Sequence, residues 1–323
     1  MIGDFLRRVM AGVALAAACA SASALDGIPL GLKSASVLIV DEDSGEVLYG
    51  KNAMTSVPIA SISKLMTAIV TLDANLPPDE PITIGDEELR ATFPNRSRLE
   101  KGATLTRDDL LHLALLASDN RAAYALGRSY PGGLPAFTEA MNRKAQELEM
   151  TGSHFEEPSG LSSHNVSTAE DLARLVRAAK SYPLIAQYST DPHYEVLIRN
   201  RPAVFRNTNA LVRAGDPDIA VQKTGFTNAA GQCLVLQVKS TARALTIVLL
   251  DSLGRYGPVA DVLRIRAWLD PSYAAPPAVA RLAFPEAAKR TRLAVAKGRS
   301  KAAASGSHVR VHAVQKVTPV QTS

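Results

Sequence analysis

The chain has 323 residues, of which 46% are hydrophobic and 21% are charged, and its formal net charge is +5. This composition excludes a largely disordered chain, a collagen-like chain and a coiled coil, and the length allows a sizeable hydrophobic core. The cysteines are Cys19 and Cys233, so a single thiol is left if the N-terminal segment is removed.

Residues 1–24 have the pattern of a secretory signal peptide. Arg7 and Arg8 precede a short run of small apolar residues, and Ala22-Ser23-Ala24 is typical of a cleavage site. The apolar run is too short to span a bilayer. We therefore expect export to the periplasm. Lipid attachment at Cys19 is the alternative, although the residues before it form a weak lipoprotein motif.

The C-terminal end of the chain differs in composition from the rest. From Ala288 onward every charged residue is basic: Lys289, Arg290, Arg292, Lys297, Arg299, Lys301, Arg310 and Lys316. We expect residues 275–323 to be a basic, disordered tail with weak attraction to an anionic wall or membrane surface. Nucleic acid is not an expected partner, because the chain is exported and the tail lacks aromatic residues for base stacking.

Residues 25–274 predict one folded domain with strands at both ends. Two short apolar runs, 36–40 and 46–49, flank a turn and predict a hairpin. Pro58 predicts the start of a helix with apolar residues at helical spacing. Capping boxes at Thr106 with Asp109 and at Ser167 with Glu170 predict two further helix starts, and helical patterns cover 110–116, 122–128 and 135–148.

The pattern changes to strand-like past Pro183. Short β-type runs cover 194–198, 203–205, 219–221, 233–238 and 245–250. A last helix is predicted from 257 to 268, and Pro271 ends it. This order favours an α+β fold in which early and late strands share one sheet, with a helical subdomain inserted at roughly 70–180.

The first candidate for chemistry is Ser61-Ile62-Ser63-Lys64, at the start of the predicted helix. Residues three apart share a helix face, so the Ser61 hydroxyl and the Lys64 amine are expected to be neighbours. The helix dipole favours negative charge on the serine oxygen, and burial lowers the pKa of a lysine so that it can act as a base. By itself the motif also fits a capped helix with a surface lysine.

Two further motifs follow in order. Ser118-Asp119-Asn120 predicts either a simple helix cap or a loop that carries a hydroxyl and an amide into a cleft. Lys223-Thr224-Gly225 continues a strand-like run. It predicts either a basic edge strand or a cation and a hydroxyl that bind a carboxylate. A glycine within a strand often marks the close approach of another backbone.

Together and in this order, S-x-x-K, S-D-N and K-T-G are the signature of serine penicillin-binding proteins and class A β-lactamases. From about residue 36 to 268 the chain resembles the low-molecular-mass penicillin-binding proteins, which are D-alanyl-D-alanine peptidases. Asp119 and Phe226 are typical of the endopeptidase branch, the penicillin-binding protein 7 type. Other segments that resemble this branch are 118–123, 130–133, 157–161, 164–169 and 223–231.

This resemblance implies a β-lactamase/transpeptidase-like fold, with an antiparallel sheet packed on helices and an inserted all-helical subdomain. It also implies a role for each motif residue. Ser61 attacks a D-alanyl carbonyl and forms an acyl-enzyme, and Lys64 takes the serine proton. Ser118 passes a proton to the leaving amine, and Asn120 orients the substrate amide.

The K-T-G strand has the binding roles in the resembled family. Lys223 supplies positive potential beside Ser118, Thr224 binds a substrate carboxylate, and Gly225 belongs to the substrate-binding strand. The backbone N–H groups of Ser61 and Phe226 form the oxyanion hole. No metal and no cofactor are expected.

Some other residues are assigned structural roles. His164 is expected to order a loop, Glu156 and Glu157 to be solvent-facing loop charges, and Cys233 to be a buried, inert thiol. A carboxylate that activated water would instead indicate a β-lactamase.

The leading functional prediction is a periplasmic D-alanyl-D-alanine endopeptidase. It acts on peptide stems and cross-links of peptidoglycan, and β-lactam antibiotics inhibit it covalently. The alternatives are a D-alanyl-D-alanine carboxypeptidase, a serine β-lactamase and a non-catalytic wall-binding protein.

Overall fold

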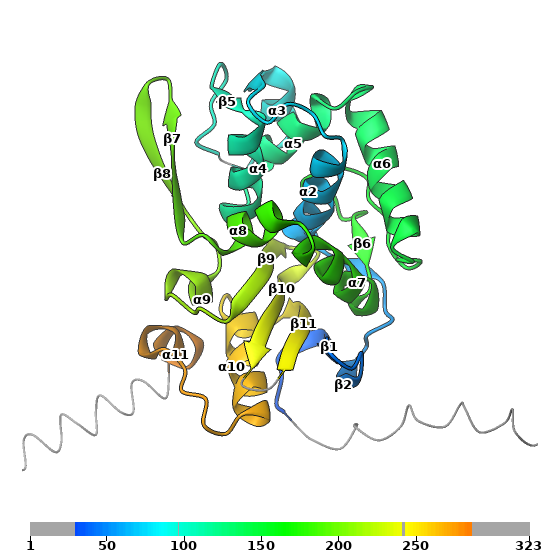
Figure 1. The fold of residues 1–323 in the computed structure, drawn as a ribbon, viewed down its shortest axis with the longest axis vertical. Coiled ribbons are helices and arrows are strands. Elements are labelled where there is room, and N and C mark those ends of the chain that lie inside the picture. The colour runs from blue at the N-terminus through cyan, green and yellow to red at the C-terminus, as the bar shows by residue number, and fades with distance from the viewer. Residues whose placement is uncertain (1–29, 96, 241–242, 286–323) are drawn as a thin grey trace, which may run out of the picture.

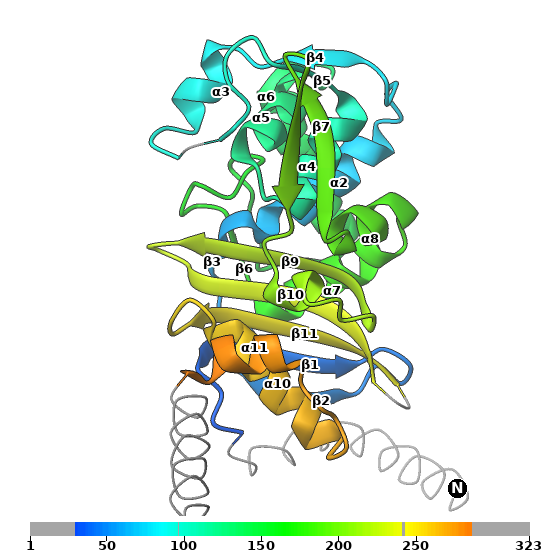
Figure 2. The same ribbon diagram turned by 90° about the vertical axis from the view of Figure 1, so that its left-hand side faces the viewer.

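A five-stranded antiparallel sheet joins the two ends of the folded chain. The computed structural model describes residues 30–95, 97–240 and 243–285. The strand order is β2-β1-β11-β10-β9, and the neighbouring strands are antiparallel. The bounds are β1 (Ser34–Asp41), β2 (Val47–Lys51), β9 (Ile219–Thr227), β10 (Gly231–Ser240) and β11 (Arg243–Ser252). The first hairpin therefore lies against the last one, as Figure 2 shows.

Alternating side chains along the strands enter two separate cores. In β1, Leu38 and Val40 belong to the larger core, whereas Val37 and Ile39 belong to the smaller one. This follows from the period of two in a strand, which directs successive side chains to opposite faces. Both faces of the sheet are therefore covered by helices.

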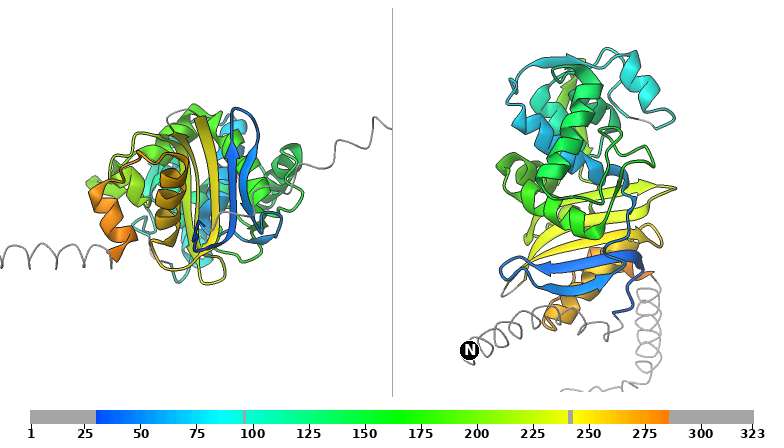
Figure 3. Two further views of the ribbon diagram at one scale, coloured as in Figure 1. Left: turned by 90° about the horizontal axis from the view of Figure 1, so that it is seen from below. Right: turned by 90° about the vertical axis from the view of Figure 1, so that its right-hand side faces the viewer.

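The smaller core lies between the sheet and α10 (Gly257–Leu269), against which α11 (Pro277–Ala283) packs. The larger core lies between the opposite face and α7 (Ala169–Lys180). Seen from below, α10 and α11 lie along one side of the sheet (Figure 3). The remaining helices are α2 (Ser63–Asp73), α3 (Asp86–Ala91), α4 (Arg107–Leu116), α5 (Asn120–Arg128), α6 (Gly133–Glu147), α8 (Pro183–Thr190) and α9 (Ala210–Arg213).

Helix α2 runs through the middle of the helical part of the molecule (Figure 1). It contacts α4, α5, α6, α7 and α8, and its residues from Ser63 to Thr71 are all buried. A helix that is apolar on most sides is stable only when neighbours cover it. The surrounding helices therefore fix the position of the residues at its N-terminal end.

Short strand pairs complete the described fold. They are β3 (Val57–Pro58) with β6 (Val166–Ser167), β4 (Pro81–Thr83) with β5 (Thr104–Thr106), and β7 (His193–Ile198) with β8 (Arg201–Arg206). The β7–β8 hairpin extends from the sheet toward α4 (Figure 1), which it contacts. No helix among the described residues is both long and apolar enough to cross a membrane.

The helix and strand patterns of the sequence are largely confirmed, with local corrections. Pro58 belongs to β3, and the helix begins only after the 3₁₀ helix η1 (Ala60–Ile62). The cap of α7 is Thr168, which accepts from the Asp171 N–H, so the capping box predicted at Ser167 is wrong by one residue. The region after Pro183 begins with α8, because this short apolar run is too brief for its period to distinguish helix from strand.

The folded part of the chain extends past the predicted boundary at Ala274. Helix α11 buries Val279 in the smaller core, so this part of the segment assigned to the tail is ordered. The predicted signal peptide with Cys19 and the basic residues from Lys289 onward lie outside the described residues.

Candidate active site

Ser61 lies in the turn where the chain enters α2. Ala60 before it has a φ of +49°, which residues with a Cβ rarely adopt. Two glycines lie against this turn. A Cβ on Gly160 would be 1.9 Å from the Ala60 carbonyl oxygen, and a Cβ on Gly225 would be 3.1 Å from Ser61 N. The nucleophile predicted from sequence is thus held between the loop that contains Gly160 and strand β9.

Lys64 lies one helical turn after Ser61 and is completely buried. Its Nζ lies 2.9 Å from Ser61 Oγ, 2.7 Å from Asn120 Oδ1 and 2.6 Å from the Ser159 carbonyl oxygen. Burial lowers the pKa of Lys64 to about 8, although the negative charges of Glu157 and Asp119 act in the opposite direction. The alternative of a surface lysine is therefore wrong, and the amine is suited to accept the Ser61 proton.

The S-D-N motif occupies the loop between α4 and α5. Ser118 has a φ of +58°. Asp119 caps α5 by accepting from the Ala122 N–H and also accepts from Ser97 Oγ at 2.6 Å. Asn120 directs its oxygen to Lys64. The motif therefore combines both predicted possibilities, because the same three residues cap a helix and bring polar groups to Lys64 and the cleft.

Lys223 brings a second amine into the site from β9. Its Nζ lies 2.8 Å from Ser118 Oγ and 2.9 Å from the Thr224 carbonyl oxygen, and its side chain is completely buried. Burial lowers the pKa of Lys223 well below its ordinary value, and the charge of Lys64 lowers it further. β9 is the last strand of the described sheet, but Lys223 points inward and does not serve as an exposed edge charge.

A cleft of about 860 Å³ opens in front of these groups and is bordered by β9. Ser61, Ser118, Asn120, Thr224 and Phe226 line it. Thr208, which the sequence analysis does not single out, also lines the cleft, and its Oγ1 lies 2.6 Å from Thr224 Oγ1. Phe226 is exposed, which leaves the outer end of β9 open to a ligand.

The loop between α6 and α7 is the part of the site that the motifs do not reveal. Asn165 is buried and accepts from the Glu156 and Glu157 N–H groups, while its amide donates to Ser63 Oγ and the Glu157 carbonyl. This holds the Ser159 carbonyl over Lys64. Asn165 lies nine and eight residues from the Glu156 and Glu157 N–H groups, so no local sequence pattern marks this contact.

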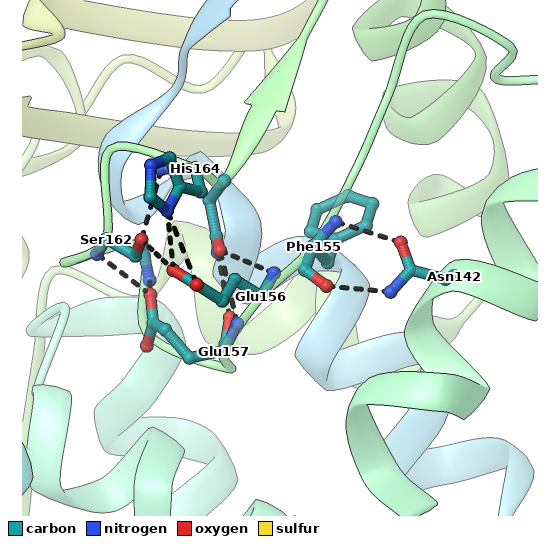
Figure 4. Close-up of polar contacts among 8 residues, drawn as sticks. Asn142, Phe155, Glu156, Glu157, Ser162 and His164 are labelled. Atoms are coloured by element: carbon teal, nitrogen blue, oxygen red, sulfur yellow. Dashed lines mark hydrogen bonds and ion pairs between the residues drawn. The ribbon is translucent and has the colours of Figure 1, made fainter. Parts of the chain in front are cut away.

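The prediction that Glu156 and Glu157 are solvent-facing loop charges is wrong for Glu157 and holds for Glu156. The Glu157 carboxylate is buried and accepts from the backbone of its own loop, so it is not a solvent-facing charge. The Glu156 side chain is half exposed and lies 3.3 Å from His164 Nδ1. His164 therefore contributes to the order of this loop, as predicted, and Figure 4 shows its ring directed at Glu156.

Cys233 is a free, buried thiol in β10, in agreement with the sequence prediction. Burial raises its pKa to about 12, so the thiolate is disfavoured. Among the described residues, no group of three or more His, Cys, Asp or Glu side chains is arranged to hold a metal ion.

The arrangement contains the parts of a serine acyl-transfer site. A hydroxyl lies within hydrogen-bond distance of a buried amine, and a second hydroxyl lies beside a second buried amine. Burial lowers the pKa values of both amines, and neither amine has a carboxylate at hydrogen-bond distance in the described residues to offset this effect. Such perturbed groups, hydrogen-bonded to two serines that line a cleft, indicate a catalytic site.

Comparisons with known proteins agree with this geometry. Residues 22–253 match the family described as D-alanyl-D-alanine carboxypeptidase. The chain is 46% identical over 274 residues to the D-alanyl-D-alanine endopeptidase of Pseudomonas aeruginosa, covering 83% of this chain and 85% of the relative. It is 43% identical over 255 residues to the D-alanyl-D-alanine endopeptidase of Escherichia coli, covering 78% and 82%.

Solved structures show the same fold. The Streptomyces K15 DD-transpeptidase superposes with a TM-score of 0.68 at 25% identity and covers 73% of this chain and 97% of its own. A D-alanyl-D-alanine carboxypeptidase of Mycobacterium tuberculosis superposes with a TM-score of 0.66 at 29% identity, covering 76% and 95%. The predicted α+β, transpeptidase-like fold class is confirmed.

Proposed function

Since the chain belongs to the D-alanyl-D-alanine carboxypeptidase family, we propose that it is a serine D-alanyl-D-alanine endopeptidase that cleaves peptide cross-links in peptidoglycan. The observation that carries the chemistry is the 2.9 Å contact between Ser61 Oγ and the buried Lys64 amine. Cleavage of cross-links, rather than removal of terminal residues, is favoured because the relatives of Pseudomonas aeruginosa and Escherichia coli, at 46% and 43% identity, are named endopeptidases.

Acylation begins with transfer of the Ser61 proton to neutral Lys64. Ser61 Oγ then attacks the carbonyl carbon of a D-alanyl residue, and the backbone N–H groups of Ser61 and Phe226 stabilise the negative charge on the carbonyl oxygen. When the amide bond breaks, Ser118 donates its hydroxyl proton to the leaving nitrogen. Ser118 regains a proton from Lys64, which thereby returns to its neutral form. Water later attacks the Ser61 ester and regenerates the enzyme.

Binding uses strand β9 and the groups at its inner end. A substrate peptide in extended conformation pairs with β9 as an added strand. Thr224, with Thr208 beside it, donates hydrogen bonds to a substrate carboxylate, and Lys223 supplies positive potential. Asn120 uses its oxygen for Lys64, which leaves its NH₂ group to donate to a substrate carbonyl.

The same site fits β-lactam antibiotics as covalent inhibitors, because their strained amide presents a carbonyl to Ser61. Incubation with a fluorescent penicillin, followed by peptide mapping, should place the label on Ser61, and Ser61→Ala should remove it. Rapid turnover of penicillin would instead favour a β-lactamase. An unlabelled folded protein would favour a non-catalytic wall-binding protein.

The choice between endopeptidase and carboxypeptidase requires a second assay. Purified protein is incubated with cross-linked dimeric muropeptides and with uncross-linked pentapeptide muropeptides. We expect monomers from the dimers. Release of free D-alanine from the pentapeptides without any cleavage of dimers would identify a carboxypeptidase.

We propose that the protein acts in the periplasm, where its substrate lies, and that the basic tail holds it weakly at an anionic wall or membrane surface. The signal-like pattern of residues 1–24 and the eight basic residues from Lys289 to Lys316 support this proposal. Cell fractionation at low and high salt, with and without residues 286–323, tests it. Salt-independent partition of both forms would contradict the role of the tail.

A further inference from the structure

We propose that Glu157 is the positioning residue of Lys64. It fastens the loop whose carbonyl directs the lysine amine at Ser61, and its negative charge acts on the same amine. This inference rests on the proposed function, in which Lys64 is the base. Glu157 itself does not touch the reacting atoms.

The Glu157 carboxylate is occupied by donors of its own loop. Oε2 accepts from the Ser159 N–H at 2.6 Å, and Oε1 accepts from the Gly160 N–H at 2.5 Å and the Ser162 N–H at 3.3 Å. The Tyr124 hydroxyl donates to the same carboxylate from α5, and the pKa of Tyr124 is raised by burial and by this negative charge. Hydrogen bonds to a buried carboxylate are stronger than neutral ones, so they fix the backbone of the loop.

The fixed backbone acts directly on the Lys64 amine. A neutral lysine amine has two N–H bonds and one lone pair. When the N–H bonds point to Asn120 Oδ1 at 2.7 Å and to the Ser159 carbonyl at 2.6 Å, the lone pair is left for the Ser61 hydroxyl at 2.9 Å. The position of the Ser159 carbonyl therefore decides where the lone pair points.

The next residue in the loop packs against the turn that carries Ser61. Gly160 packs so closely on the turn before Ser61 that a Cβ would lie 1.9 Å from the Ala60 carbonyl oxygen. Two of the three backbone N–H groups from which Glu157 accepts thus belong to the residue over Lys64 and to the residue against the turn of Ser61. A shift of this loop displaces both partners of the proton transfer at once.

The charge of Glu157 acts on Lys64 in addition. The charged or titratable groups that face Lys64 are Glu157 in the loop, Asp119 before α5 and Lys223 on β9, with Tyr124 of α5 bound to Glu157. Glu157 and Asp119 favour the ammonium form and so oppose the effect of burial on the Lys64 pKa. Removal of the Glu157 charge therefore lowers the Lys64 pKa.

The neighbouring Glu156 offers a matched control. It has the same side chain one position earlier in the same loop, but it is half exposed and its partners are Ser162 Oγ and His164. Figure 4 shows that these side chains turn toward Glu156, while Glu157 reaches backbone N–H groups of the loop. Within the described residues, the Glu156 side chain makes no hydrogen bond to Ser159, Gly160 or Lys64. It therefore has the same charge as Glu157 but does not hold the part of the loop that contacts Lys64.

The experiment measures the second-order rate of Ser61 acylation by a fluorescent penicillin between pH 5 and pH 10. The variants are Glu157→Gln, Glu157→Asp and Glu156→Gln, with thermal unfolding as the check of folding. For the wild type the rate should rise through about pH 8 as Lys64 loses its proton. Glu157→Gln should lower this midpoint by about one pH unit and the plateau rate about tenfold.

Glu156→Gln should leave the midpoint and the plateau unchanged, and Glu157→Asp should return the midpoint toward that of the wild type. A midpoint in Glu157→Gln that is unchanged or higher overturns the proposal, whatever the plateau. If Glu157→Gln does not fold, Glu157→Asp serves as the test. An unchanged plateau rate of acylation in Glu157→Asp would then overturn the proposal. A wild type that penicillin does not acylate refutes the proposed function and is thereby distinguished from a failure at Glu157.

Discussion

The two faces of the central sheet offer contrasting examples of buried charged side chains. Against α10, the buried Asp261 accepts from the backbone N–H groups of Lys33 and Ser34, from Ser34 Oγ and from Arg264. Arg266, also buried, pairs with Asp216 and Asp218 and lies over the Tyr273 ring. Each of these charges has partners of opposite sign or a full set of donors.

On the other face, two buried amines of the same sign share one site. Lys64 and Lys223 hydrogen-bond to hydroxyl and carbonyl oxygens, which are uncharged. Uncharged acceptors satisfy the N–H groups but compensate little for the lost hydration of an ammonium ion. The pKa values of both amines are lowered for this reason.

This difference relates burial to function. A buried charge with complete compensation holds elements together, and here it ties the start of β1 to α10. A buried amine without a charged partner remains able to lose its proton near neutral pH, which is the property that a general base needs. Variants that change the partners of these buried groups on either face of the sheet therefore test the comparison directly.

The largest effect is expected for Lys64→Arg. Arginine keeps a positive charge and hydrogen-bond donors but does not release its proton, so the acylation rate with a fluorescent penicillin should fall by about 10³ or more. Lys144→Arg is the matched control, because Lys144 pairs with Asp73 and Glu147 away from the cleft. Ser61 of this variant should be acylated at the wild-type rate. Near-normal acylation of Lys64→Arg would show that the base lies elsewhere.

The second effect concerns the backbone that carries the site. Gly160 has a φ of +81° and no room for a Cβ beside the Ala60 carbonyl. Gly160→Ala should displace the turn at Ser61 and lower the acylation rate about 100-fold. Gly215→Ala separates strain from displacement, since Gly215 has a φ of +77° with open space around it. Gly215→Ala should lower the stability slightly and leave the acylation rate unchanged. Equal rates for the two variants would contradict this account.

The sequence predicts the local elements and the residues with recognisable motifs. The box of Thr106 and Asp109 forms as expected, because a cap depends on residues close in the chain. The motif residues Ser61, Lys64 and Lys223 also meet as expected, since their order and residue types are characteristic of one known arrangement.

The missed features depend on backbone atoms and distant contacts. The partner of Lys64 in the loop is the Ser159 carbonyl, 95 residues away, and a carbonyl has no residue type to recognise. Glu157 resembles any loop acid until its N–H donors are located. Thr208 gains a role only because the chain returns beside Thr224.

A smaller effect is expected at Asp261 on the α10 face. Asp261→Asn keeps the shape but removes the charge and replaces an acceptor oxygen by a donor. This should lower the free energy of unfolding by about 2 kcal/mol, measured by denaturant titration. The rate of Ser61 acylation and its pH midpoint should not change in the folded fraction. A shifted midpoint would mean that the two faces are electrically coupled, which would weaken the contrast between them.

The smallest effect is expected at His112, whose burial is only partly compensated by nearby charges and which therefore lies between the two cases compared above. His112 is buried on the active-site side between the rings of Tyr188 and Tyr194, with Nε2 3.0 Å from Asp191 Oδ2. Burial lowers its pKa, and Asp191, Asp108 and Asp109 oppose this only in part.

Because the folded protein binds the His112 proton less readily than the unfolded chain, stability should decrease as the pH falls below about 6.5, the ordinary histidine value. His112→Phe keeps a ring in the stack and cannot titrate, so its unfolding free energy should fall less between pH 7 and pH 5. A steeper fall in His112→Phe would mean that the three carboxylates compensate the buried ring fully. His112 would then belong with Asp261 and Arg266, as a charge that stabilises the fold.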